Sequence, residues 1–256
     1  PLAHGKARWL SAPLFLLRAG LILAAWAAAI VWLRRTFDAL RPGAERAGAG
    51  ASVAFLLLLG PTITLTSFDW AMSVEPSWYS TAYGVYGFAS SFQAGIAAIA
   101  ALSPLLLPED ARGPKIRHDL GKLLFAFSIF WAYIWFCQYM LIWYANLPEE
   151  VPHYTHRLAR PWAPLFWLPP LLCFVVPFIA LLSARAKRIP AVLATVSIVV
   201  LAGRWLDVYV QIAPDWHPTP PAPLYSLAAG VAVLAGMALL VHRAWRRRAP
   251  AHVAGD

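Results

Sequence analysis

The sequence predicts an all-α integral membrane protein, and three observations support this fold class. Hydrophobic residues make up 60% of the 256 positions and charged residues only 13%, about half the share found in soluble domains. Thirteen residues are tryptophan, which is enriched where a membrane meets water. Apolar stretches of roughly 20 residues, long enough to cross about 30 Å of hydrocarbon, recur along the chain.

We expect a single membrane domain over residues 1–256 with seven transmembrane helices. The predicted spans are residues 13–33, 49–68, 81–107, 123–147, 162–184, 191–212 and 224–245. The fifth span contains Pro169, Pro170 and Pro177. Prolines are tolerated inside spans when neighbouring helices satisfy the carbonyl groups that they leave free. This span is therefore predicted to be a kinked helix.

The basic residues predict which side of the membrane each loop faces. Of the 21 lysines and arginines, fifteen fall on one side of the seven-span arrangement, two lie inside spans, and four fall on the other side, namely Lys6, Arg8, Arg157 and Arg160. Loops rich in lysine and arginine face the cytoplasm, so the N-terminus of this sequence is predicted outside and the C-terminus inside. The net charge of +9 is then a topology signal rather than a sign of nucleic-acid binding. The sequence starts with Pro1, its start is predicted outside, and it has an odd number of spans. We therefore expect that it is part of a longer chain or that a signal sequence has been removed from it.

A stripe of polar side chains predicts a site inside the membrane. Tyr79, Tyr83, Tyr86, Ser90 and Gln93 repeat at steps of four and three, so a helix would present all five on one face. Hydroxyl and amide groups facing lipid are costly unless they meet protein, water or a ligand. In the predicted topology this stripe and most other polar residues of the spans belong to the outer half of the membrane.

Two arginines inside spans allow alternative interpretations. Arg204, Asp207 and Gln211 share one helical face, where they form either an intrahelical ion pair that stabilises packing or part of a proton path. Arg18 either extends its side chain to the membrane surface or pairs with an acid such as Asp69 or Asp207. An unpaired charge facing lipid would cost about 2.5 to 3.5 kcal/mol at the helix centre.

No redox centre is predicted for this chain. All seven histidines fall in loops, at helix ends or in the tails, whereas a haem held between helices needs histidines at depth on facing helices. Cys137 and Cys173 are far from any Cys-x-x-Cys spacing and are expected to be packing residues, with a disulfide or redox role as the alternative. We therefore expect no haem, flavin or metal bound by this chain.

Three sequence motifs carry a resemblance to a known family. They are residues 67–84 (SFDWAMSVEPSWYSTAYG), 118–127 (HDLGKLLFAF) and 130–150 (FWAYIWFCQYMLIWYANLPEE). The chain resembles the quinone-binding membrane subunits of bacterial alternative complex III, NrfD-like proteins related to the polysulfide reductase membrane subunit, and among them it looks most similar to the ActF-type subunits. The resemblance covers most of the chain between Lys6 and Arg248.

The resemblance implies a helical-bundle protein of about ten spans in a bacterial inner membrane, of which this sequence holds a C-terminal part. It implies menaquinone or ubiquinone as substrate, with electrons passing to cytochrome c or an oxidase. The implied partners are an iron–sulfur subunit, multihaem cytochrome c subunits and a paralogous NrfD-like membrane subunit. Where the family motif often reads Glu-Pro-His-Trp, this chain has Ser77 between Pro76 and Trp78, so one potential proton acceptor is missing.

We therefore predict a membrane subunit of a respiratory quinol:electron acceptor oxidoreductase that contributes a periplasmic-side quinol site, a proton path, or both. The alternative is a secondary transporter or a non-redox scaffold subunit. The predicted proton acceptors and path residues are Asp69, Glu75 and Asp207. The predicted pocket residues and charge partners are Arg18, Tyr83, Tyr86, Gln93, Gln138 and Arg204.

Overall fold

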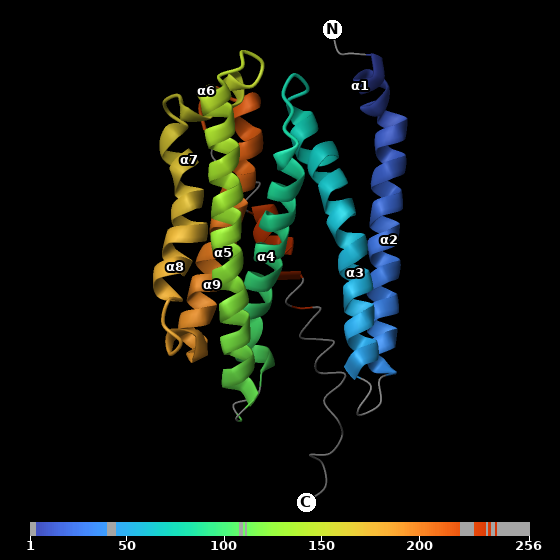
Figure 1. The fold of residues 1–256 in the computed structure, drawn as a ribbon, viewed down its shortest axis with the longest axis vertical. Helices are drawn as coiled ribbons and strands as arrows, with labels where there is room; N and C mark the ends of the chain where they lie inside the picture. The colour runs from blue at the N-terminus through green and yellow to red at the C-terminus, as the bar shows by residue number, and fades with distance from the viewer. Residues whose placement is uncertain are drawn as a thin grey trace, which may run out of the picture. The chain divides into compact units, whose positions relative to one another are not determined.

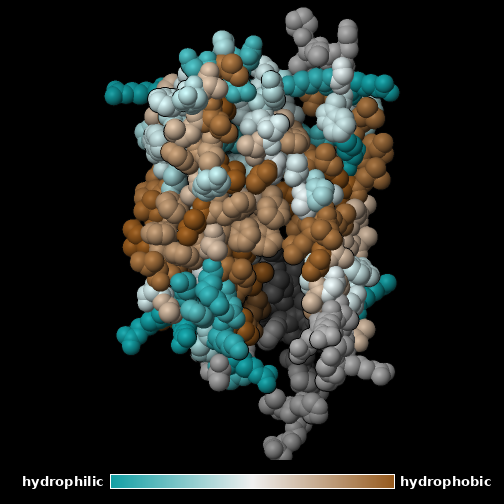
Figure 2. Space-filling view, viewed as in Figure 1, coloured by the Kyte–Doolittle hydropathy of each residue, from teal (hydrophilic) through white to brown (hydrophobic). Residues whose placement is uncertain are grey.

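In a computed structural model, residues 4–39, 45–107, 110, 112–220, 228–233, 235–236 and 239 are described, and within them every regular element is a helix. Six helical stretches are long and apolar enough to cross a membrane. They are Ala12–Asp38, Gly48–Val74, Ala82–Leu106, Arg112–Ala145, Ala163–Ala180 and Pro190–Asp215. Hydrophobic residues lie along the middle of the helices and hydrophilic residues at their ends (Figure 2). The all-α, multi-pass membrane prediction is thus confirmed, while the predicted seventh span, 224–245, lies largely outside the described residues.

The chain divides into two compact units. The first unit comprises Pro1–Ile96 and Leu123–Ala159, and the second comprises Ala97–Lys122 and Arg160–Asp256. The elements that contribute to the first unit are α1 (His4–Trp9), α2 (Ala12–Asp38), α3 (Glu45–Thr66), a π turn η1 (Ser67–Ala71), a 3-10 turn η2 (Met72–Val74), most of α4 (Ala82–Leu106), most of α5 (Arg112–Ala145), and α6 (Val151–Leu158) (Figure 1).

In the first unit, α2 and α3 pack side by side (Figure 1). The Trp26 indole Nε1 donates a hydrogen bond to Thr62 Oγ1 at 2.8 Å. Pro61 lies inside α3, and the Thr62 hydroxyl that follows it donates back to the Leu58 carbonyl at 2.7 Å. Such a hydroxyl satisfies backbone groups that have no water partner at this depth.

Helix α4 approaches the end of α3 closely because two of its residues are glycines. A Cβ at Gly84 would lie 2.5 Å from Thr64 Cγ2, and a Cβ at Gly87 would lie 1.8 Å from Ser67 Oγ. Neither distance is physically possible, so any larger residue would push the helices apart. Small residues at a membrane helix interface permit this spacing.

The second unit is built around α9 (Pro190–Ile212). Residues 163–180 form one helical path in which α7 (Ala163–Pro170) passes through a π turn η3 (Leu171–Val175) into α8 (Val176–Ala180). The irregular turn follows Pro169 and Pro170, which agrees with the kinked helix predicted there. Gly203 of α9 packs against this turn, since a Cβ there would lie 2.5 Å from Cys173 Sγ. The remaining short elements are η4 (Ala186–Arg188) and η5 (Ala213–Asp215).

The apolar stretch predicted to start a span at Leu123 belongs to a longer helix, because α5 begins at Arg112 with polar first turns. One sequence prediction needs correction. Tyr79 does not join the α4 stripe, since α4 begins at Ala82 and Tyr79 lies in the preceding loop, 58% exposed. The stripe on α4 therefore starts at Tyr83.

Candidate functional site

Three segments meet at one end of the first unit. They are the start of the chain with α1, the turns η1 and η2 with the loop that follows, and α6 with the end of α5. The Lys6 ammonium donates to the Pro76 carbonyl, the Trp9 indole donates to Asp69, and His153 contacts Glu75. The charge count predicts that this end faces outward.

Asp69 in η1 is held by two partners. Its carboxylate accepts from Arg18 Nε at 2.7 Å, from Arg18 Nη2 at 3.1 Å and from Trp9 Nε1 at 2.8 Å. The Arg18 guanidinium also lies 3.9 Å from the centre of the Trp9 ring, a favourable cation–π geometry. Asp69 is only 2% exposed. Of the two alternatives for Arg18, the structure shows pairing, and Asp69 is the acid.

Glu75, directly after η2, is bound by residues of α6. Its Oε2 lies 2.7 Å from His153 Nδ1 and 3.7 Å from Arg157 Nη1. Arg157 Nη1 also donates to the His153 carbonyl at 2.6 Å. His153 and Arg157 are both buried, and the Trp78 ring stacks on the His153 ring at 3.8 Å with an interplanar angle of 6°. In this Glu75–His153–Arg157 cluster, a partly buried carboxylate contacts the imidazole of a buried histidine beside a buried arginine.

The environment shifts the titration of Glu75. Burial raises the pKa of this carboxyl above its ordinary value, and the nearby positive charge of Arg157 opposes the shift only in part. A raised carboxyl pKa is typical of a group that exchanges protons. Glu75 is thus the predicted proton acceptor whose surroundings fit that role best.

Aromatic rings connect the cluster to α4 and α5 in a closed series of contacts. Each ring centre lies between 3.8 and 6.4 Å from the next. The members, in order around the series, are His153, Trp78, Tyr83, Tyr86, Trp131, Trp135, Tyr139 and Tyr154. The predicted pocket residues Tyr83 and Tyr86 are therefore buried members of this ring series.

Two predicted glutamines are also buried in the first unit. Gln93 Nε2 donates to Ser128 Oγ at 2.9 Å and so links α4 to α5. Gln138 is 2% exposed, and its Oε1 has no hydrogen-bond partner among the described residues. The same is true of Trp78 Nε1. A buried polar atom of this kind is a position where a bound ligand or water can restore the missing bond.

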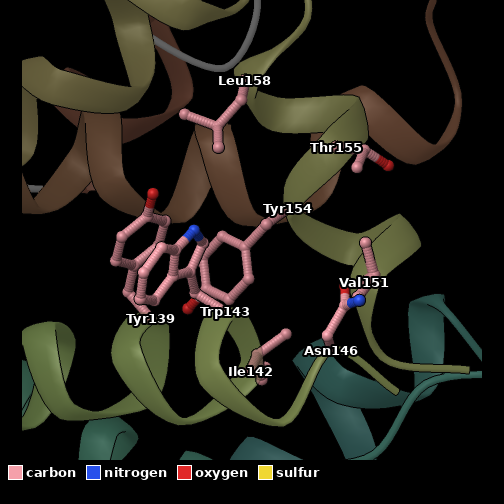
Figure 3. A pocket seen from close by; sticks show the side chains of 8 residues that line it. All are labelled: Tyr139, Ile142, Trp143, Asn146, Val151, Tyr154, Thr155 and Leu158. Atoms are coloured by element: carbon pink, nitrogen blue, oxygen red, sulfur yellow. The ribbon is translucent and has the colours of Figure 1, made fainter. Parts of the chain in front are cut away.

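A cavity of about 380 Å³ opens between the end of α5 and α6. In Figure 3 the rings of Tyr139, Trp143 and Tyr154 gather on one side, and Asn146 and Thr155 lie on the other. The Thr155 hydroxyl donates to the Pro152 carbonyl at 3.1 Å, which leaves its oxygen as an acceptor. Because Tyr154 packs edge-on against His153, with ring centres 5.1 Å apart, the cavity adjoins the Glu75–His153–Arg157 cluster. Its size and mixed lining are those of a small-molecule site.

The second unit holds the other predicted charged pair. Arg204 Nη2 lies 3.4 Å from Asp207 Oδ2 on the same helix, and Arg204 Nε lies 3.2 Å from Cys173 Sγ. Both charged side chains are buried. The intrahelical ion pair, one of the two interpretations that the spacing allowed, is present, and Cys173, which forms no disulfide, packs against Arg204.

The nine predicted site residues fall into two groups. Arg18, Asp69, Glu75, Tyr83, Tyr86, Gln93 and Gln138 belong to the first unit, whereas Arg204 and Asp207 belong to the second. The sequence analysis missed His153, Arg157 and the cavity residues. The signal was present, because His153 and Arg157 stand four apart and share a face if their loop is helical, as it is in α6.

Comparison of the chain with protein-family models gave no match. Comparison with curated proteins likewise gave no significant match. The fold defines the class of protein, a multi-pass, all-α membrane protein with a buried polar site.

Proposed function

We propose that this chain is a membrane subunit of a respiratory quinol:electron acceptor oxidoreductase, with cytochrome c as the expected acceptor, and that it binds quinol at the outer end of its first unit. The observation that carries the proposal is the buried Glu75–His153–Arg157 cluster beside an aromatic cavity at the end of apolar helices. A membrane-dissolved aromatic substrate that gives up protons needs both features.

The cavity fits the head group of a quinol. Tyr139, Trp143 and Tyr154 offer faces and edges for packing against a planar ring. The Asn146 amide and the Thr155 hydroxyl can hydrogen-bond the two ring oxygens of such a substrate. The cavity lies where α5 ends, so the isoprenoid tail of the substrate can remain against the apolar surface of the helices.

The cluster supplies a proton acceptor. Oxidation of a quinol to a quinone releases two electrons and two protons. The His153 imidazole, oriented through Nδ1 by Glu75, can take a proton and share it with the carboxylate, and Arg157 limits the charge that builds up. We propose that the electrons leave through a partner subunit carrying iron–sulfur clusters or haem, as the family resemblance implies, and that the protons leave on the periplasmic side.

Other predicted residues take supporting roles in this proposal. Asp69 and Arg18 hold the η1 turn, and thereby the loop bearing Glu75, against the start of the chain. Tyr83 and Tyr86 belong to the aromatic series next to the cluster, and Gln93 joins α4 to α5. Gln138 offers its side-chain oxygen as a hydrogen-bond acceptor. Asp207 with Arg204 remains a candidate for a proton path in the second unit.

The proposal is tested by quinol kinetics on the assembled complex. Thr155→Val removes one hydroxyl from the cavity and keeps its shape, and Tyr139→Ala removes one ring. Each is expected to raise the KM for a short-chain quinol at least threefold. The matched control is Tyr144→Ala, because Tyr144 lies on the same helix with 84% of its surface exposed. Unchanged kinetics in both cavity variants, in complexes that assemble, would place quinol elsewhere. Purification as a functional oligomer without iron–sulfur or haem partners would favour a transporter.

A further inference from the structure

A second cavity lies in the second unit, and none of its lining residues belongs to the site described above. Its volume is about 570 Å³, within the range of small-molecule sites. It is lined by two residues of α5 and by the loop that leads through η4 into α9. The lining residues that matter are Pro114, Arg117, Arg185, Arg188, Ile189 and Pro190.

Positive charge dominates this cavity. Three arginines line it, and among the described lining residues none is acidic. Arg117 is 1% exposed, so its charge acts in a medium of low dielectric constant, where it attracts an anion more strongly than a surface lysine does. The planar, forked guanidinium groups of Arg185 and Arg188 match the oxygens of a phosphate.

The fold holds the arginines in place. Gly121 of α5 lies so close to η4 that a Cβ there would come within 2.9 Å of Lys187 Cβ and Cγ. Lys187 is itself buried and reaches back to the Leu182 carbonyl at 3.5 Å. The η4 turn is thus pinned on α5 by Lys187, and Arg185 and Arg188 on either side of it line the cavity.

The start of α9 adds to the attraction for an anion. Ile189 and Pro190 lie at the N-terminus of this helix, whose first turn contains no acidic residue and whose N-cap makes no side-chain hydrogen bond. A helix of this length carries about half a positive charge at its N-terminus. With the buried arginine beside it, this end is built to receive negative charge.

The position indicates which anion. Both α5 and α9 are candidate membrane spans, and the cavity lies at their N-terminal ends, where the head groups of lipids lie. Ile189, which lines the cavity, is 42% exposed, and two further exposed apolar residues stand within two positions of lining residues in the chain, Ile116 at 40% and Leu182 at 64%. They offer a surface for acyl chains next to a site for a phosphate. Basic pockets between spans on the cytoplasmic side, where the charge count places this end, are typical of anionic lipid sites.

We propose that this arginine-lined cavity binds the phosphate head group of an anionic phospholipid. This proposal does not depend on the proposed quinol function, because the two sites use different residues. Arg117, Arg185 and Arg188 hold the phosphodiester, and the acyl chains lie along Ile116, Leu182 and Ile189.

Native mass spectrometry of the full chain in detergent, titrated with phosphatidylglycerol, tests this proposal. The double variant Arg185→Gln/Arg188→Gln changes two exposed side chains and is expected to weaken retention of phosphatidylglycerol at least tenfold. The matched control is Arg34→Gln/Arg35→Gln, an exposed basic pair on the same predicted side that does not line the cavity. It is expected to retain the lipid as the natural chain does.

Two further arms identify the source of the phosphate. Phosphatidylcholine should be retained at least tenfold less well than phosphatidylglycerol, and 10 mM inorganic phosphate should not displace bound phosphatidylglycerol. Three outcomes would each overturn the proposal. They are an equal loss of lipid in the cavity variant and the control, equal retention of the two lipids, and displacement of the lipid by inorganic phosphate. The last outcome would indicate a site for a soluble anion.

Discussion

Asp69 and Glu75 belong to the same short segment after α3, yet their surroundings differ. Asp69 accepts three hydrogen bonds, two from Arg18 and one from Trp9, and is tied to a residue 51 positions away. Glu75 touches His153 at 2.7 Å and meets its arginine only at 3.7 Å. The first carboxylate has its oxygens occupied by permanent donors. The second shares its contact with a group that can itself gain and lose a proton.

This difference teaches what each acid contributes. A buried carboxylate bound by a guanidinium in two places is a structural tie, because breaking it leaves an uncompensated charge. A partly buried carboxylate with a raised pKa and an imidazole neighbour is suited to exchange protons. The comparison therefore indicates anchoring for Asp69 and supports the proposed proton exchange at Glu75, and four experiments can break or sharpen it.

The largest expected effect is on stability. Asp69→Asn removes the charge that Arg18 needs and should lower the free energy of unfolding by about 3 kcal/mol, the scale for breaking a buried ion pair. Denaturation of the purified protein in detergent measures it. Asp38→Asn is the control, because Asp38 is half-exposed and pairs with Arg34 at 3.7 Å on the surface, where such pairs contribute up to about 1 kcal/mol. Equal, small losses in both variants would contradict the anchoring role.

The next effect is on activity. Glu75→Gln keeps the shape and removes the proton acceptor, so quinol oxidation by the assembled complex should fall at least tenfold, equivalent to about 1.4 kcal/mol of barrier. Glu149→Gln is the control. It alters an exposed carboxylate in the loop between α5 and α6 and should leave the rate unchanged. A wild-type rate in Glu75→Gln would make this carboxylate structural. A greater loss in Asp69→Asn at equal assembly would reverse the two roles.

A smaller effect is expected from the hydrogen bond between α4 and α5. Ser128→Ala removes the acceptor of the Gln93 amide and should cost about 1 to 2 kcal/mol of stability. Because Ser128 does not contact the cluster, quinol oxidation should stay within about twofold of wild type, a small fraction of 1.4 kcal/mol. A tenfold loss of rate with normal assembly would extend the site along the stripe to Gln93.

The smallest effect is a pH dependence. The raised pKa of Glu75 means that the folded protein holds this proton to higher pH than the unfolded chain does. Glu75 therefore stabilises the fold fully below its unfolded pKa, near 4.5, and this contribution is lost as pH rises through the folded value. Melting curves of wild type minus Glu75→Gln should show a difference that declines across this window. A difference that grows with pH would mean that the positive charges of Arg157 and His156, which lower the pKa of Glu75, outweigh burial.

Part of this site followed from sequence alone. The spacing of Tyr83, Tyr86 and Gln93 predicted that they share one helical face, and the cost of an unpaired charge made pairing with an acid one of two alternatives for Arg18. The choice between Asp69 and Asp207 depended on which helices are neighbours, which periodicity does not reveal. His153 and Arg157 escaped because a short polar loop was not expected to fold into a helix and bury them.

Helix starts show a further limit of sequence patterns. Apolar length marks where a helix meets hydrocarbon, not where its hydrogen bonds begin, so α5 starts at Arg112, well before its apolar residues. Helix α4 starts at Ala82, after the turns η1 and η2, so the prediction that Tyr79 joins its polar stripe was wrong.

The stack of Trp78 on His153 makes the fluorescence of the indole sensitive to the charge of the imidazole. With ring planes 6° apart and centres 3.8 Å apart, a proton gained by the imidazole places a full positive charge on the face of the indole. Charged imidazole so close to an excited indole is an efficient quencher. In the proposed quinol oxidation, emission from Trp78 should therefore fall when His153 gains a proton, and comparison with a Trp78→Phe variant separates this signal from those of the other twelve tryptophans.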